Sequence, residues 1–251
     1  MIIDFPTQAQ IPGLRDLWKE AFGDPDAFLD HFYHTGFSKD RCRCICLDGK
    51  ILAALYWFDC RWQDRNLAYI YAVATAKSHR GQGLSRKLME NTQTLLLSLG
   101  YSGVVLVPAE PSLFAFYEKM GYRCFGGIRQ WQCAVGEKAI TLKALTATQY
   151  AQLRQPMLPA GSVLQEGALL DFLSTYARFY QGDDFLLCCA DDGGKLLGYE
   201  LLGNTDAAPG ILAALGCKSG MFRTAGDTSF AMYRSLTADP AAPQYFAFAL
   251  D

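Results

Sequence analysis

The sequence predicts an α/β protein with a mixed sheet, and three observations lead to this expectation. A buried strand candidate, a glycine turn and an amphipathic helix follow one another without interruption over residues 67–97. Strand and helix candidates also alternate before and after this stretch. A hairpin pattern over residues 44–52 returns over residues 188–197, which indicates that one arrangement is built twice.

The stretch from residue 67 to residue 97 also predicts a binding site. Residues 67–74 are apolar, aromatic or β-branched and carry no charge, which is typical of a strand buried on both faces. From Leu84 onward the apolar residues recur at spacings of three and four, as in a helix. Gly81 and Gly83 allow a tight turn that brings backbone N–H groups to the helix N-terminus. Such a turn predicts an anion site.

Composition limits the class of protein. The chain of 251 residues is 51% hydrophobic, so it can bury a substantial core in one or two domains, and we expect two. The net charge of −2 gives no support for nucleic acid or a membrane surface as a partner. No leader pattern or membrane-spanning run is found, so a cytoplasmic protein is expected. The nine cysteines form no CxxC pair, which favours reduced thiols.

The first half of the chain is expected to form a series of ten elements. Their order is β-α-α-β-β-β-α-β-α-β, with helix starts at Pro12 and at the Asp24-Pro25-Asp26 cap, and a hairpin turn at Asp48-Gly49. The expected strands cover residues 1–5, 42–47, 51–60, 67–74, 104–107 and 129–135, and the last short helix covers residues 113–120.

This order, together with two motifs, resembles the GCN5-related N-acetyltransferase (GNAT) superfamily. The family's phosphate-binding signature is Gln or Arg, two residues, Gly, one residue, then Gly or Ala. Its counterpart here is Arg80-Gly81-Gln82-Gly83-Leu84-Ser85, in which Ser85 is a small residue at the last position. A second signature is matched by Phe116-Tyr117-Glu118-Lys119-Met120-Gly121-Tyr122. The resemblance covers residues 1–135, which we expect to be the catalytic domain.

The resemblance implies acetyl-CoA as co-substrate and no metal. The amides of the turn, with the helix dipole, would bind the pyrophosphate, and the strand before the turn would pair with the pantetheine arm. An amine would attack the thioester directly in a ternary complex, and the N–H of Val73 would meet the oxyanion. Tyr117 would protonate the leaving thiolate, with Tyr122 as the second choice. The implied cofactor-binding residues are Val73, Ala74, Thr75, Arg80, Gly81, Gln82, Gly83, Leu84 and Ser85.

The general base is not identified by the motifs. Many relatives carry a carboxylate on the fourth strand, whereas residues 67–72 contain no acid. Asp59, Asp64 and Glu110 are alternatives that would act through water. The carboxylate of Asp251 is a further alternative, because a C-terminal carboxylate reaches the active site in some multidomain relatives that modify aminoglycosides.

Two further groups of residues are not interpreted as metal sites. Cys42, Cys44 and Cys46 lie on one face of a strand, in a row rather than a tetrahedron. His31 and His34 share a helix face without a third ligand at metal spacing.

Residues 136–251 are expected to form a degenerate second copy of the fold. A strand over residues 140–145 leads to a helix capped by Thr146, a second helix is expected over residues 165–180, and the hairpin follows. No phosphate-binding signature comes after it, so this half is expected not to bind CoA. Two more strands are expected, over residues 230–233 and 245–250. In related proteins such a half helps to close the acceptor pocket.

The sequence thus predicts an acetyl-CoA-dependent N-acetyltransferase whose acceptor is a small-molecule or peptide amine. Acidic and aromatic residues near the expected site favour a small cationic amine. The alternative is a non-catalytic sensor that binds acyl-CoA. This alternative stays open because the sequence identifies no general base. The oligomeric state and the length of the acyl group stay open.

Overall fold

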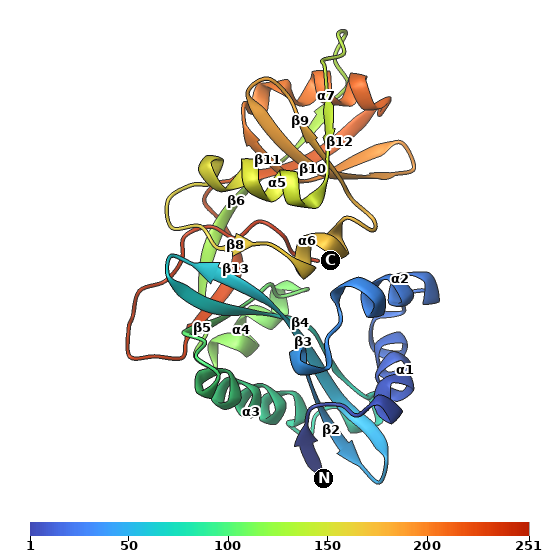
Figure 1. Cartoon of the computed structure of the whole chain (residues 1–251), viewed down its shortest axis with the longest axis vertical. Helices are drawn as coiled ribbons and strands as arrows, with labels where there is room; N and C mark the ends of the chain where they lie inside the picture. The colour runs from blue at the N-terminus through green and yellow to red at the C-terminus, as the bar shows by residue number, and fades with distance from the viewer. Residues whose placement is uncertain (251) are drawn as a thin grey trace.

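The computed structural model describes residues 1–250, and its centre is one mixed sheet of 13 strands (Figure 1). The strand order is β1-β2-β3-β4-β5-β13-β6-β12-β11-β10-β9-β7, and β8 pairs separately with β3. Figure 1 shows two lobes, with the first half of the chain below and most of the second half above. The α/β class with a mixed sheet is confirmed.

The first half contains the ten expected elements in the expected order. Strand β6 begins at Arg123 rather than at residue 129. The elements are β1 (Ile2–Asp4), α1 (Ile11–Phe22), α2 (Asp26–His31), β2 (Cys42–Leu47), β3 (Lys50–Trp62), β4 (Arg65–Thr75), α3 (Leu84–Ser98), β5 (Gly103–Leu106), α4 (Pro111–Glu118) and β6 (Arg123–Ala134).

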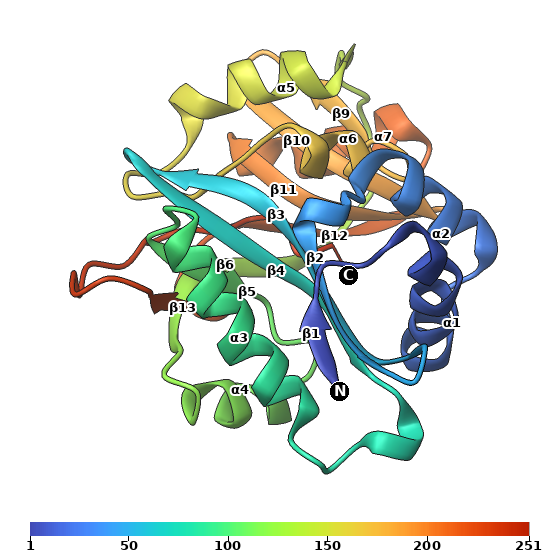
Figure 2. The same cartoon turned by 60° about the horizontal axis from the view of Figure 1, so that its bottom comes forward.

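Helices cover both faces of this first-half sheet (Figures 1 and 2). On one face Leu14 and Trp18 of α1 pack with Tyr56 of β3 in a hydrophobic cluster that extends into the second half. On the other face Leu88 of α3 and Tyr117 of α4 belong to a separate cluster. Strands β3 and β4 are therefore buried on both sides, as the uncharged run in β4 predicts.

The second half begins with a well-formed helix cap. Thr146 accepts a hydrogen bond from the Gln149 N–H, and the Gln149 side chain accepts one from the Thr146 N–H, so the predicted cap is confirmed. The elements are β7 (Lys143–Leu145), α5 (Ala147–Arg154), β8 (Leu164–Gln165), α6 (Ala168–Leu173), β9 (Arg178–Gln181), β10 (Phe185–Asp192), β11 (Lys195–Gly203), α7 (Ala208–Leu215), β12 (Ser219–Ala225) and β13 (Thr228–Ser235).

Two predicted elements of this half are wrong. The helix expected over residues 165–180 is instead β8, the short helix α6 and β9. Gly167 has φ 59°, which interrupts the helix on one side, and Arg178–Gln181 pairs with β10 on the other. The strand expected over residues 245–250 is an irregular segment with a single bridge, between Ser162 and Tyr245. Hydrogen bonds to the side chain of Gln165 replace a strand partner.

Strand β13 returns from the second half into the sheet of the first. It lies between β5 and β6, where Met232 stands opposite Leu106 on one side and Cys124 on the other. The expected boundary after residue 135 falls at the end of β6, which itself pairs with β12 and β13 of the second half. The two halves therefore share one sheet.

No helix within residues 1–250 is long and apolar enough to cross a lipid bilayer. The longest, α3, has 15 residues.

Candidate active site

Strands β4 and β5 run side by side for a short distance and then separate. They are parallel and pair only from Leu67 to Tyr69 on β4, with Tyr69 opposite Val105. Strand β4 continues to Thr75 with β3 as its neighbour on the other side. Beyond Tyr69, the edge of β4 that faces β5 therefore has no strand partner among the described residues. Val73, Ala74 and Thr75 lie on this part of β4.

A strained residue marks the point of separation. Ala72 has φ 48°, a left-handed conformation that costs a non-glycine residue about 1–2 kcal/mol. It lies in a bulge, because Tyr71 is opposite Tyr56 while Ala74 is opposite Ala54. Strain of this kind is often held at functional sites. Ala72 could not be predicted from the sequence, since alanine has no preference for this conformation and gives no signal.

The turn after β4 presents a row of free hydrogen-bond donors. Gly81 and Gly83 have φ 75° and 74°, and a side chain on either would meet open space, so the backbone conformation is what requires glycine. The first bond of α3 runs from the Lys87 N–H to the Gly83 C=O, 3.0 Å. Among residues 1–250 no acceptor is found for the N–H groups of residues 81–86. This arrangement is typical of an anion site.

The charges around this turn favour the same ligand. Arg86 and Lys87 are exposed in the first turn of α3, which contains no acid. Cations at a helix N-terminus oppose the helix dipole, so they are favourable there only beside a bound anion. Arg80 is exposed, and its Nε donates to the Thr75 C=O at 3.2 Å, which ties the turn to the end of β4.

Thr75 contributes an unsatisfied polar group at the same place. Its Oγ1 is buried and has no hydrogen-bond partner among the described residues. An unpaired buried hydroxyl is costly, and a polar ligand on the edge of β4 would satisfy it. The end of β4 at Thr75 is thus joined to the glycine turn by the bond from Arg80.

Tyr117 lies on the face of the sheet that α3 and α4 cover. Its ring packs edge-on against Phe116 and Tyr122 and belongs to the cluster that contains Leu84, with Val73 packed against it. Burial raises the pKa of Tyr117 to about 12, so the hydroxyl is protonated at neutral pH. No protein hydrogen bond is found for this hydroxyl within residues 1–250.

Tyr122 is in a different situation. Its hydroxyl accepts a hydrogen bond from Gln93 Nε2 at 2.8 Å, and it is buried among α3 and α4. Burial raises the pKa of Tyr122 well above that of an exposed tyrosine. The hydroxyl of Tyr117, rather than that of Tyr122, is therefore the one that no protein group engages in the described part of the chain.

Two of the alternative bases lie away from the separation point. Asp59 stands opposite Ala68, about 17 Å along β4 from Val73, and Asp64 is at the hairpin tip, about 30 Å from Val73, at about 3.3 Å per residue. Asp59 also accepts bonds from Arg41 at 2.8 Å and 2.9 Å and from the Tyr101 hydroxyl. It lines a separate pocket of about 720 Å³ at that end of the sheet. Both distances exceed the reach of one bridging water.

Glu110 lies nearer to the expected reaction centre. It precedes α4 at the carboxyl end of β5, and parallel strands bring their carboxyl ends to one edge of a sheet. Its side chain is exposed. Asp251 lies outside the described residues. The segment before it, however, runs to the separation point, where the Leu250 N–H donates to the Tyr69 hydroxyl at 3.2 Å.

Comparison with known proteins gives a family and a fold. Residues 3–125 match the family model described as an acetyltransferase (GNAT) domain. A GCN5-related N-acetyltransferase from Anabaena variabilis is similar in structure, with 16% identity and a TM-score of 0.72 over 94% of this chain and 73% of that one. Its counterpart from Kribbella flavida has 17% identity and a TM-score of 0.68 over 93% and 70%.

A third similar structure is Eis1 from Mycobacterium abscessus, with 12% identity and a TM-score of 0.65 over 94% of this chain and 74% of that one. No protein of curated description matches the chain in sequence. At these identities the structural matches establish the fold, and the match covers both halves of the chain.

Proposed function

We propose that the chain, which carries a GNAT acetyltransferase domain over residues 3–125, transfers an acetyl group from acetyl-CoA to a primary amine in a ternary complex. Family and fold together support acyl transfer from an acyl-CoA. The observation that carries the proposal is the separation of β4 from β5 directly beside the donor-rich turn of residues 81–86.

Donor binding uses the backbone. The N–H groups of Gly81, Gln82, Gly83, Leu84 and Ser85 hold the pyrophosphate, and the positive side chain of Arg80 adds to the field. The pantetheine arm pairs with the free edge of β4 at Val73, Ala74 and Thr75 as an added strand would. This places the thioester between β4 and β5, close to the bulge at Ala72.

The reaction is a direct attack on the thioester carbonyl. The amine nitrogen forms a bond to the carbonyl carbon, and the negative charge that develops on oxygen is stabilised by the N–H of Val73. The C–S bond then breaks, and Tyr117 gives its hydroxyl proton to the leaving thiolate. The protein needs no metal for these steps.

The amine must lose a proton during the reaction, and Glu110 is the described carboxylate best placed to accept it through water. It lies on the same edge of the sheet as Val73, whereas Asp59 and Asp64 lie far along the strands. Glu110→Gln is expected to lower kcat about 100-fold, which is within the usual contribution of a general base.

The test is release of free CoA thiol from acetyl-CoA over a panel of amines, beside calorimetric binding of CoA. Turnover of at least one amine is expected. Binding without turnover of any amine would favour the acyl-CoA sensor instead. Absence of CoA binding would reject both functions.

A further inference from the structure

The last segment of the chain, Tyr245–Leu250, is buried between the two lobes although it forms no strand. All six residues are at most 5% exposed. In Figures 1 and 2 the red end of the chain runs inward beside α6 and the strands of the first half. A buried irregular segment has to find partners for its backbone groups.

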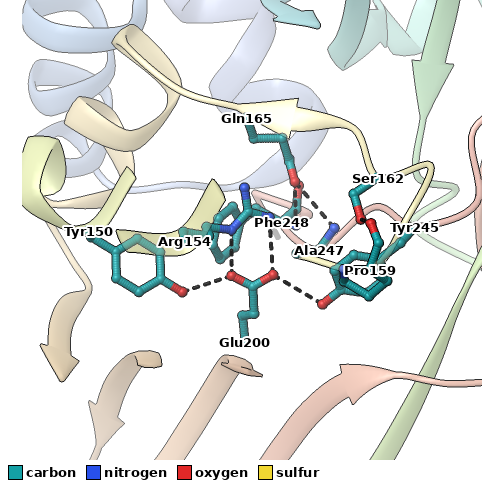
Figure 3. A network of polar contacts seen from close by, with 9 residues as sticks. All are labelled: Tyr150, Arg154, Pro159, Ser162, Gln165, Glu200, Tyr245, Ala247 and Phe248. Carbon is teal, nitrogen blue, oxygen red and sulfur yellow. Dashed lines mark hydrogen bonds and ion pairs between the residues drawn. The ribbon is translucent and has the colours of Figure 1, made fainter. Parts of the chain in front are cut away.

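One set of partners gathers around Glu200 of β11 (Figure 3). Its completely buried carboxylate accepts from Arg154 Nε at 2.6 Å and Nη2 at 3.0 Å, from the Tyr150 hydroxyl at 2.7 Å and from the Tyr245 hydroxyl at 3.1 Å. A buried ion pair adds little net stability, because removing both charges from water is costly. What this one does is fix the position of Tyr245.

Gln165 of β8 supplies the second set (Figure 3). Its Oε1 accepts from the N–H groups of Ala247 at 3.2 Å and Phe248 at 3.0 Å, and its Nε2 donates to the Phe248 C=O at 2.8 Å. The side chain thereby replaces a neighbouring strand. Because Gln165 itself stands opposite Cys60 of β3, it joins the end of the chain to the first-half sheet.

The segment held in this way ends against Tyr69. The ring of Phe246 packs edge-on to the Tyr69 ring at 4.9 Å, and the Leu250 N–H donates to the Tyr69 hydroxyl. Gly126 of β6 has φ 68°, and a Cβ there would lie 3.2 Å from the Phe246 nitrogen, so the fit is close on that side as well.

Tyr69 is the last residue of β4 that pairs with β5, and its side chain belongs to the cluster on the α1 side of the sheet. Tyr117 belongs to the cluster on the opposite, α3 side. The thioester lies between these two faces in the proposed reaction. Tyr117 therefore approaches the leaving thiolate from the α3 side of the sheet. The amine then has to approach the thioester from the α1 side, where Tyr69 and the buried segment lie.

We infer that Gln165 and Glu200 are positioning residues that hold Tyr245–Leu250 as one wall of the acceptor pocket. This inference rests on the proposed function. Neither side chain touches donor or acceptor. Both act through the buried segment, which fixes Tyr69 and with it the angle at which the amine reaches the thioester.

The test uses Gln165→Leu in the full chain, which removes three hydrogen bonds with little change in volume. Faster amide exchange over residues 244–250 is expected, with at least a tenfold rise in KM for the best acceptor among spermidine, L-lysine and phenylethylamine. KM for acetyl-CoA and Kd for CoA are expected to stay within twofold. Glu166→Gln, next in the chain and paired with Arg61 near the surface, is the control and is expected to change none of these.

Tyr69→Phe serves as a second variant that keeps the ring and removes the hydroxyl, and a smaller rise in the acceptor KM is expected. Faster exchange with an unchanged acceptor KM would overturn the positioning role and leave the acetyltransferase intact. An equal loss of CoA affinity would show general loosening, which also overturns it. If the wild-type chain acetylates no amine, the proposed function itself fails.

Discussion

The two halves of the chain contain the same supersecondary unit with different helix starts. In the first half β4, α3 and β5 form a parallel crossover, and in the second half β11, α7 and β12 form another. Both first strands also carry a bulge, at Ala72 in β4 and at Tyr199 in β11. The difference lies in the turn that joins each strand to its helix.

At the start of α3 the N–H donors are free, whereas the turn before α7 carries a side-chain cap at Asn204. Asn204 accepts from the Asp206 N–H at 2.9 Å and donates to Asp184 at 3.0 Å. Asp206 brings a negative charge to this turn, and Pro209 removes an N–H from the first turn of α7. The same unit therefore presents free N–H groups, as an anion site requires, in one half and a capped turn in the other.

The two strands differ in acidity as well. Strand β4 carries no acid between Leu67 and Thr75, whereas β11 carries Glu200, whose carboxylate is fully engaged by Arg154 and two tyrosines. One half thus keeps an open edge for a ligand, and the other has filled its interior with a polar network. This contrast is consistent with the proposal that the second half serves structure and acceptor binding, and four experiments test that division.

The largest effect is expected when the second half is removed. A fragment of residues 1–135 lacks β13, so the facing edges of β5 and β6 lose their partner and Met232 no longer fills the core between them. We expect no cooperative thermal unfolding, measured by circular dichroism. A soluble fragment that melts cooperatively and binds CoA would show that the halves are independent.

The next effect concerns Tyr117. Removing its hydroxyl in Tyr117→Phe is expected to lower kcat roughly 100-fold, since general acids contribute about 10²–10⁴. KM for acetyl-CoA should hardly change, because the ring is kept. The rate of thiol release measures this, with Tyr180→Phe on β9 of the second half as control. A variant that keeps full activity would remove Tyr117 from the mechanism.

A third pair of variants compares the two helices directly. Gly83→Ala changes the start of α3, and Gly216→Ala changes the end of α7. Each variant places a side chain at positive φ in open space, so each should lower the free energy of unfolding by about 1–2 kcal/mol. Only the first should weaken CoA binding, by about tenfold if that strain displaces the N–H groups. Calorimetry gives the affinities, and equal losses in both variants would contradict a local anion site.

The smallest effect is expected for the dependence of kcat on pH. Burial raises the pKa of Tyr117 to about 12 from its usual value near 10. Below pH about 10 the residue is protonated in the folded and the unfolded chain, and its contribution to stability is lost only between about pH 10 and 12, where the unfolded chain ionises first. The profile of kcat should thus show no fall from Tyr117 below pH about 10. A fall near pH 8.5 that disappears in Tyr117→Phe would refute the assignment of its pKa.

Much of the first half could be predicted because its signals are local. Gly81 and Gly83 are required by a backbone conformation, and Asp24-Pro25-Asp26 begins a helix by its own chemistry, so no distant contact is needed to interpret them. The strand and helix periods of β4 and α3 are equally local. These features led from the residues to the fold and to the GNAT family.

The remainder depends on contacts between residues that are far apart in sequence. The helix expected over residues 165–180 is cut short because Gln165 pairs with Cys60 of β3 and Arg178–Gln181 pairs with β10. The positive φ of Ala72 goes with a bulge in the pairing of β4 with β3. The carboxylate of Asp59 accepts hydrogen bonds from Arg41 and Tyr101. Neither periodicity nor a motif reports such partners. The assignment of Val73, Thr75, Arg80 and Tyr117 to the site stays a prediction until CoA binding is measured.

The return of β13 also has a consequence for how the chain folds as it is synthesised. Gly103 of β5 pairs with Ser235, so the first half cannot complete its sheet until nearly the whole chain has left the ribosome. Contacts between residues so distant in sequence make folding slow, and until they form the edges of β5 and β6 are exposed to other chains. The half that resembles an enzyme on its own therefore acquires its final form last, and chains interrupted before residue 228 would be prone to aggregate.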